Sequence, residues 1–195
     1  GHGNIPNHTP MITTRFLDPE EYGKYSVWLK QLDSETRATY FGLTYSDEQI
    51  DMLMSKIINC PAQHHFLVAE YKGQWIGTVH LAESNNDEIE FGFIVDGLHR
   101  GHGIADRLMS EATVWARNRG FKSLYMHCLS WNTPIKRLCA KHGMTLETAA
   151  GETETKLPLP PADLSTITEE IATRNRQVYR MFLQSSNPFL KEAYV

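Results

Sequence analysis

Two segments near the start of the chain carry apolar residues at helical spacing. The first follows Asp18-Pro19-Glu20-Glu21, which combines an N-cap residue, a proline at the first helical position and an acid three residues after the cap. The second begins at Ser46, where Gln49 completes a capping box, and ends before Pro61. With residues 12–16 as a short strand before them, this part of the chain is predicted to hold one strand and two helices.

The spacing of apolar residues then changes from about 3.6 to two, which is the period of β-strands. His65 to Tyr71 and Gln74 to Ala82 flank Lys72-Gly73 and are predicted to form a hairpin. A polar turn at residues 84–87 leads to a third strand, Glu88 to Val95. These three strands are expected to form an antiparallel meander.

A further helix is predicted after a turn that contains two glycines. Its apolar face runs from Ile104 to Ala116, and Gly120 is suited to terminate it. The next elements are predicted as a strand at residues 122–129, a helix at 133–142 and two strands between 144 and 159, around Gly151. No repeat or low-complexity linker interrupts this order.

Residues 160–195 differ in character from residues 11–159 and are predicted to form a helical extension. Three prolines at residues 158–161 break the last strand, and a capping box at residues 166–169 starts a helix that Asn187-Pro188 ends. One side of this helix is an apolar stripe of Ile167, Ile171, Val178 and Phe182. We expect the stripe to be buried, either on its own domain or across a two-fold dimer. The first is favoured, because nothing else in the chain indicates a second large apolar surface.

The composition fits one soluble domain. The 195 residues are 41% hydrophobic and 22% charged, an ordinary balance for a globular protein. A net charge of −4 gives no general attraction for nucleic acid or an anionic membrane, so neither is expected as a partner. No apolar run reaches the ~20 residues that a membrane span requires, and the N-terminus lacks the pattern of a secretory signal. A cytoplasmic protein is therefore expected.

The cysteines favour the same compartment. Cys60, Cys128 and Cys139 are odd in number and lack the spacing of metal ligands, which is typical of reduced thiols in a cytosol. Residues 1–10, GHGNIPNHTP, precede the first methionine and are left out of the fold prediction.

The stretch HRGHGIADRL, residues 99–108, is the strongest candidate for a functional site. Exposed N–H groups and the helix dipole make a strand-to-helix turn an anion site, and Gly101 and Gly103 allow close approach. Positive charge is available from Arg100, His102 and Arg107. A dinucleotide fingerprint would need glycine where Asp106 stands, and the lysine of a P-loop is absent. The alternative is a plain tight turn before a helix.

The residues around this turn resemble a known superfamily. Arg100 to Ala105 fits the R/Q-x-x-G-x-G/A pattern with which GNAT acyltransferases hold the pyrophosphate of acyl-coenzyme A. EFGFIVDGLHR, LYMHCL and NTPIKRLCAKHG are similar to elements of that superfamily in order and length, from about Phe66 to Leu146. LDSETRATYFG, residues 32–42, further resembles the protein-lysine acetyltransferase domains that modify acyl-CoA synthetases.

The resemblance implies a fold and a reaction. The fold is an α/β GNAT domain, with a mixed, mostly antiparallel sheet flanked by helices and an extra C-terminal helix. The reaction is direct transfer of an acetyl group from acetyl-CoA to a primary amine, on a protein lysine or a small molecule, by a monomer or homodimer and without a metal. The alternative is a catalytically weak CoA-binding sensor or interaction module. The implied acetyl-CoA-binding residues are Phe93, Ile94, Val95, Arg100, Gly101, His102, Gly103, Ile104, Ala105 and Asn132.

Such a transfer needs a general base, because an alkylammonium with a pKa of ~10.4 is almost wholly protonated at neutral pH. Glu90 is the first candidate, since it shares a strand face with Glu88 and Gly92, which leaves a space beside it. It also stands where related enzymes carry their base. His127 competes, because an imidazole accepts a proton near neutral pH. The alternatives are a solvated strand carboxylate and a hydrogen-bonded histidine of the core.

The sequence departs from the family pattern at the general acid, the residue that protonates the leaving thiolate. Many members carry a tyrosine seven residues after Asn132 to protonate the leaving thiolate, and here that residue is Cys139. This thiol is expected to pack as a small apolar side chain, so no general acid is assigned.

Two other groups of residues are weighed. The histidines at 99 and 102, or at 64 and 65, have no carboxylate or thiol at matching spacing, so no metal site is predicted. An aromatic cluster surrounds Arg37 and either shapes a substrate pocket or packs the early helices, which is the favoured interpretation. Its members are Trp28, Tyr40, Phe41 and Tyr45.

Overall fold

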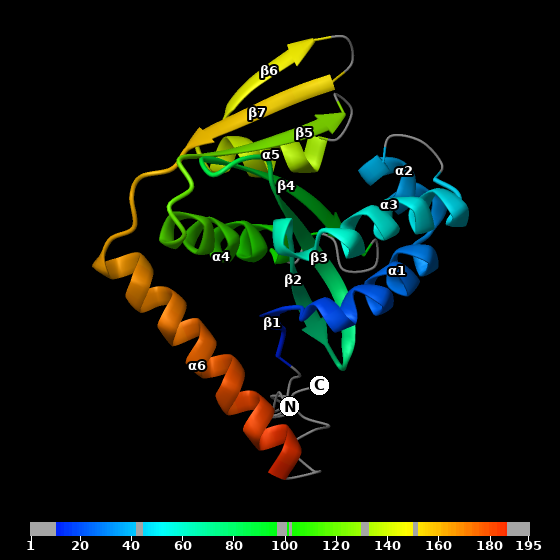
Figure 1. Ribbon diagram of the computed structural model, residues 1–195. Helices are drawn as coiled ribbons and strands as arrows, with labels where there is room; N and C mark the ends of the chain where they lie inside the picture. The colour runs from blue at the N-terminus through cyan, green and yellow to red at the C-terminus, as the bar shows by residue number, and fades with distance from the viewer. Residues whose placement is uncertain are drawn as a thin grey trace, which may run out of the picture.

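The computed structural model describes residues 11–41, 45–96, 101, 103–129, 133–149 and 152–186. Its centre is one seven-stranded sheet of order β1-β2-β3-β4-β5-β7-β6 (Figure 1). The strands are β1 Thr13–Phe16, β2 His64–Tyr71, β3 Gln74–Glu83, β4 Glu88–Val95, β5 Ser123–Leu129, β6 Thr145–Ala149 and β7 Glu152–Pro158. The helices are α1 Tyr22–Gln31, α2 Ser34–Phe41, α3 Asp47–Asn59, α4 Ile104–Asn118, α5 Thr133–Lys141 and α6 Leu164–Ser186, with short 3-10 turns at Pro19–Glu21 and Pro61–Gln63.

All neighbouring strands of the sheet are antiparallel except β4 and β5, which run parallel. The β2–β3 hairpin turns at Lys72 and Gly73, both with positive φ, as the sequence predicts. The mixed, mostly antiparallel sheet, the flanking helices and the C-terminal helix are thus confirmed.

Alternation along the strands gives the sheet two apolar faces. Leu67 and Phe91 pack with α4 and α5 in one core, whereas Phe66 and Ile94 pack with α1 and α3 in the other. Each strand of the meander is therefore buried on both faces, and the helices lie in two layers around the sheet (Figure 1).

Two helix starts follow the sequence closely. At α3, the Ser46 hydroxyl accepts from the Gln49 N–H at 3.2 Å, and the Gln49 side chain accepts from the Ser46 N–H at 2.8 Å. The Asp18 capping box is also present, but its first turn is a 3-10 turn that continues as α1.

The helix α2 is absent from the prediction, which expected two early helices rather than three. It starts beside Asp33, whose carboxylate accepts from the Thr36 N–H at 2.7 Å and its hydroxyl at 3.0 Å. The segment SETRATYF carries few apolar residues, so helical periodicity does not reveal it. In the sequence, the available signal for the start of this helix was Asp33, a residue type that is preferred as an N-cap.

The start of α6 also differs from the prediction. The helix begins at Leu164, because Asp163 and Thr166 cap it reciprocally, with bonds of 2.9 and 3.0 Å. These contacts hold the pKa of Asp163 below its ordinary value, with the Thr166 N–H as the main cause. The favoured alternative, burial of the α6 stripe on its own domain, is wrong, since the stripe is exposed in the single copy, from 46% at Ile167 to 65% at Val178. Burial across a two-fold dimer stays a prediction.

Candidate functional site

The candidate site lies where β4 and β5 part. The two strands pair at only three positions, of which Glu90 and Tyr125 form the last. Beyond that pair β5 remains with β7 as far as Leu129, and β4 remains with β3 as far as Val95. In the ranges that the structure describes, the β5-facing edge of residues 91–95 therefore has no strand partner.

Backbone N–H groups point into this opening. The Asp96 N–H donates to the Ile76 carbonyl of β3 at 2.9 Å. Because successive N–H groups of a strand point to opposite edges, those of Val95 and Phe93 are directed at the side facing β5. The side chains of Phe93 and Ile94 are buried in opposite cores, and the same alternation directs the Ile94 N–H at β3. Of these two predicted residues, only Phe93 can therefore offer a backbone N–H to a ligand in the opening.

Two glycines of the turn hold backbone conformations that favour glycine. Gly101 has a φ of 85° and Gly103, the N-cap of α4, a φ of 73°, a region that side chains with a Cβ rarely adopt. Chain neighbours aside, no heavy atom of the described residues lies within 4 Å of where a Cβ would stand at either position. The first N–H groups of α4 lie directly after the turn, at Ile104 and Ala105.

The predicted partners of this turn fall into two groups. Arg100, His102 and Asn132 lie outside the described residues. Ile104 is buried against the sheet, where a Cβ on Gly77 would stand 2.8 Å from its side chain. Arg107 does not add charge to the turn, because its guanidinium donates to the Ile12 carbonyl at 2.7 Å and to Glu111 at 3.3 Å.

Asp106 connects the start of α4 to the end of α5. Its carboxylate lies 2.7 Å from His142 Nε2 and 3.2 Å from Lys141 Nζ. The hydrogen bonds from His142 and Lys141 hold the pKa of Asp106 below its ordinary value. The carboxylate that rules out a dinucleotide fingerprint thus has a structural role beside the turn.

Glu90 lies on the sheet face covered by α2, half-buried, with Tyr40 beside it. Tyr40 occupies the space over Gly92, since a Cβ there would stand 2.7 Å from its hydroxyl oxygen. Burial, and then the nearby Glu90 carboxylate, raise the pKa of the Tyr40 hydroxyl. The space expected beside Glu90 is therefore filled by Tyr40, whose position over Gly92 the sequence did not reveal.

A half-buried histidine, His80, lies on the same sheet face. His80 pairs across the strands with Gly92, stacks on Phe66 at 4.6 Å and lies 2.9 Å from His64 Nδ1 through its Nε2. Burial and the neighbouring His64 lower the pKa of His80 to about 3, and burial also lowers the pKa of His64. The pair is neutral at physiological pH, and His65 points to the other face, where it meets Glu83.

His127, the competing candidate base, is exposed, whereas Cys139, which stands where family members carry the acid, is buried. His127 is exposed on β5, with its ring 5.6 Å from that of Tyr125, whose hydroxyl bonds to Ser84. Cys139 is fully buried, with its Sγ 3.7 Å from the Met126 sulfur. The packing role expected for this thiol is confirmed.

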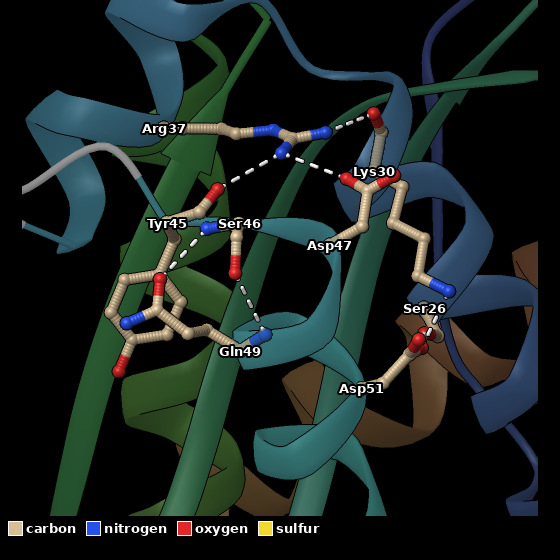
Figure 2. A network of polar contacts seen from close by, with 8 residues as sticks. All are labelled: Ser26, Lys30, Arg37, Tyr45, Ser46, Asp47, Gln49 and Asp51. Atoms are coloured by element: carbon tan, nitrogen blue, oxygen red, sulfur yellow. Dashed lines mark hydrogen bonds and ion pairs between the residues drawn. The ribbon is translucent and has the colours of Figure 1, made fainter.

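Arg37 holds the three early helices together (Figure 2). Its guanidinium donates to the Tyr45 carbonyl and the Asp47 carboxylate, both at 3.0 Å, and to the Lys30 carbonyl. The aromatics Trp28, Tyr40 and Tyr45 pack against the second core, as predicted, and the side chain of Phe41 lies outside the description. This network fixes α2, and with it Tyr40, over the strand that carries Glu90.

Other features do not belong to this site. A cavity of about 690 Å³ lies at the β1 edge of the sheet, between β1, α4 and α6. Among the described side chains, no three histidines, cysteines or acids are grouped to hold a metal. None of the helices in those ranges is long and apolar enough to cross a membrane.

Residues 27–144 match the sequence profile of the acetyltransferase (GNAT) family. This match covers more than half of the chain, which therefore belongs to the GNAT family of acetyltransferases. No curated protein sequence matches the chain significantly.

Solved structures show the same fold. The GNAT domain of PAT from S. lividans is 20% identical, with a TM-score of 0.62 over 75% of this chain and 89% of that one. YncA from Salmonella typhimurium, a putative acetyltransferase solved with its cofactor acetyl-CoA, is 18% identical, with a TM-score of 0.60 over 78% and 96%. Spermidine N-acetyltransferase from Vibrio cholerae, in complex with CoA and spermine, is 20% identical, with a TM-score of 0.60 over 76% and 95%.

Proposed function

We propose that this protein transfers an acetyl group from acetyl-CoA to a primary amine, with Glu90 as the general base. The observation that carries the proposal is the position of Glu90 at the last pair before β4 and β5 part. A carboxylate there stands beside the opening into which the β4 backbone directs its N–H groups. The strand edge proposed to bind acetyl-CoA and the proposed base thus both lie on β4.

The donor fits the opening and the turn. An acyl-CoA carries an amide-containing arm that can pair with the β4 edge as an added strand does. Its pyrophosphate would take the N–H groups that follow Gly101 and Gly103, where the backbone is open to close approach. The Val95 N–H would donate to the thioester oxygen, which gains negative charge as the amine attacks.

The base acts on the amine. The Glu90 carboxylate would accept the proton of the attacking ammonium, directly or through a water, and release the neutral nucleophile. The amine nitrogen then forms a bond to the acetyl carbon as the bond from that carbon to sulfur breaks, and the second proton that the nitrogen loses passes to water. Cys139 is buried in the core away from solvent, so water is the proton source left for the departing thiolate.

The acceptor is proposed to be a cation. Glu88 and Glu90 lie two residues apart on one strand face and are both half-buried, which favours an alkylammonium there. Lysine side chains and polyamines both meet this description, and spermine is the ligand of one structural neighbour. Protein lysine and small-molecule amines therefore stay as the two acceptor classes.

The test follows free thiol released from acetyl-CoA, with and without a panel of lysine peptides and polyamines. The proposal predicts amine-dependent release that saturates with one class of acceptor. Tight acetyl-CoA binding without release for any amine would instead support the CoA-binding module. Loss of release in His127→Gln, with Glu90→Gln active, would make His127 the base.

A further inference from the structure

The helix α6 turns its polar side toward its own domain. Arg119 of α4 forms an ion pair with Glu170 at 2.6 Å, and its guanidinium also lies 4.5 Å from the Trp115 ring centre. Asn118 donates to the Thr166 carbonyl and to the Glu170 carboxylate, both at 3.0 Å. The contacts between α6 and α4 are thus made by charged and amide groups.

The polar contacts continue along the helix. Arg117 bonds to the Pro160 and Pro161 carbonyls and to Asp163, just before α6 starts. Further along, the polar residues Glu169, Thr173 and Gln177 line the cavity of about 690 Å³ between α6 and β1. The partly exposed side chains of Val178 and Met181 also line it. A surface helix normally buries its apolar side and exposes these groups, so α6 has the reverse orientation.

The outward side of α6 is apolar. Seven of the twelve exposed large hydrophobic side chains of the described ranges lie on this one helix, between 46% and 80% exposed. They are Leu164, Ile167, Ile171, Val178, Tyr179, Met181 and Phe182. Successive residues of a helix are about 100° apart around its axis. Five of these side chains and Asn175 therefore fall within an arc of about 80°, with Tyr179 and Met181 on either side of it. We call this set the outer stripe: Leu164, Ile167, Ile171, Asn175, Val178 and Phe182.

The outer stripe holds no charged side chain, and Arg174 alone stands at its edge. Soluble monomers rarely expose a continuous apolar surface of this extent. Figure 1 shows α6 at the periphery of the molecule.

We propose that the outer stripe of α6 packs against the same stripe of a second copy, forming a homodimer. Specific dimers bury about 800 Å² per partner, and seven large side chains exposed to this degree provide an area of that order. A two-fold pair needs one self-complementary patch, and a helix face with apolar residues at both ends is such a patch. Asn175, in the middle of the stripe, is suited to fix the register of the pair.

A membrane surface is a less suitable partner for the outer stripe than a second copy of the chain. A helix that lies on a lipid surface presents lysines and arginines beside its apolar face, at the level of the head groups. Here α6 contains no lysine, and two of its three arginines, Arg174 and Arg180, line the cavity on the domain side, while Arg176 lies off the stripe. The second copy is therefore the occupant that the charge distribution favours.

The experiment measures the mass of the full chain by sedimentation equilibrium at micromolar concentrations. The test variant is Ile171→Glu/Val178→Glu, which adds two negative charges to the stripe. The matched control is Arg176→Glu, which changes the charge of the same helix by the same amount but lies off the stripe. Ile171→Gln/Val178→Gln tests the same contact without charge.

The proposal predicts a dimer for the natural chain and for Arg176→Glu, and a monomer for both double variants. All variants should keep the circular dichroism of the natural chain, because the replaced side chains are exposed in the single copy. A monomeric natural chain, or a double variant that stays dimeric, would overturn the proposal. Binding of a monomeric natural chain to phosphatidylserine vesicles, lost in Ile171→Glu/Val178→Glu, would overturn it in favour of a lipid surface.

Discussion

The hydroxyl of Tyr40 lies where a side chain on Gly92 would begin, 2.7 Å from the position of that Cβ. Gly92 is two residues from Glu90 on the same strand face, so the missing side chain lets α2 bring a tyrosine over the proposed base. The pKa of that tyrosine is raised by burial and by Glu90, which makes the three residues one local unit.

This relationship predicts the effect of Gly92→Ala. The new methyl group displaces Tyr40 and costs about 1–3 kcal/mol of the free energy of unfolding, the usual range for an overpacked core. Tyr40→Phe removes the closest atom and leaves ring carbons at 3.1 and 3.3 Å, so Gly92→Ala should cost less in that background. Urea unfolding of the four proteins measures the coupling. Strictly additive costs would show that the two residues do not meet.

The glycine turn predicts a separation of binding from stability. Gly103→Ala places a Cβ at a positive φ beside the proposed pyrophosphate site, so acetyl-CoA binding should weaken strongly while the protein stays folded. Gly120→Ala, at the far end of α4, has a similar φ of 82° and also no atom within 4 Å. Each should lose about 1–2 kcal/mol of stability. Calorimetry that finds equal acetyl-CoA affinity in the two variants would contradict the anion site.

The contacts of Arg37 predict that the packing of the early helices affects binding of the acceptor amine. Arg37→Ala removes three donated hydrogen bonds and should lower the free energy of unfolding by about 2–3 kcal/mol. Because α2 carries Tyr40, the KM for the amine should rise more than the Kd for acetyl-CoA. Lys24→Ala removes an exposed positive charge from α1 and serves as the control. A rise in the Kd for acetyl-CoA that equals the rise in KM would show a general loss of structure instead.

His80 predicts a pH dependence of stability. Its pKa is about 3 in the folded protein, against about 6.5 in an unfolded chain, so below pH 6.5 the unfolded state binds a proton that the folded state does not. Stability from this group is fully present above pH 6.5 and is lost as pH falls toward 3, at up to ~1.4 kcal/mol per pH unit. His80→Gln should make the unfolding free energy less dependent on pH between 7 and 4.5. Equal slopes in urea titrations of the two proteins would contradict this.

The strands and the long helices were predictable because their apolar residues repeat at one period. The hairpin at Lys72-Gly73 and the capping box of Ser46 depend on neighbours in sequence, and both are present in the structure. The helix α2 was not predicted, because its stability comes from Asp33 and from Arg37 contacts with other helices.

The candidate site divides in the same way. Glu90 and the glycine turn could be found from the sequence, because their spacing is local. The nearness of Tyr40 to Gly92 and of His64 to His80 depends on long-range packing that no local pattern reports. The favoured burial of the α6 stripe on its own domain was wrong, since an apolar stripe indicates that a helix has a partner and not which chain supplies it.

The central claim is that Glu90 removes the proton of the amine. Glu90→Gln keeps the shape of the side chain and removes its basicity, so turnover of acetyl-CoA with the preferred amine should fall about 100-fold or more. The Kd for acetyl-CoA, measured by calorimetry on the same preparation, should change little, because the proposed contacts to acetyl-CoA are made by backbone groups. Turnover within a few-fold of the natural chain in Glu90→Gln, with that Kd unchanged, would contradict the account.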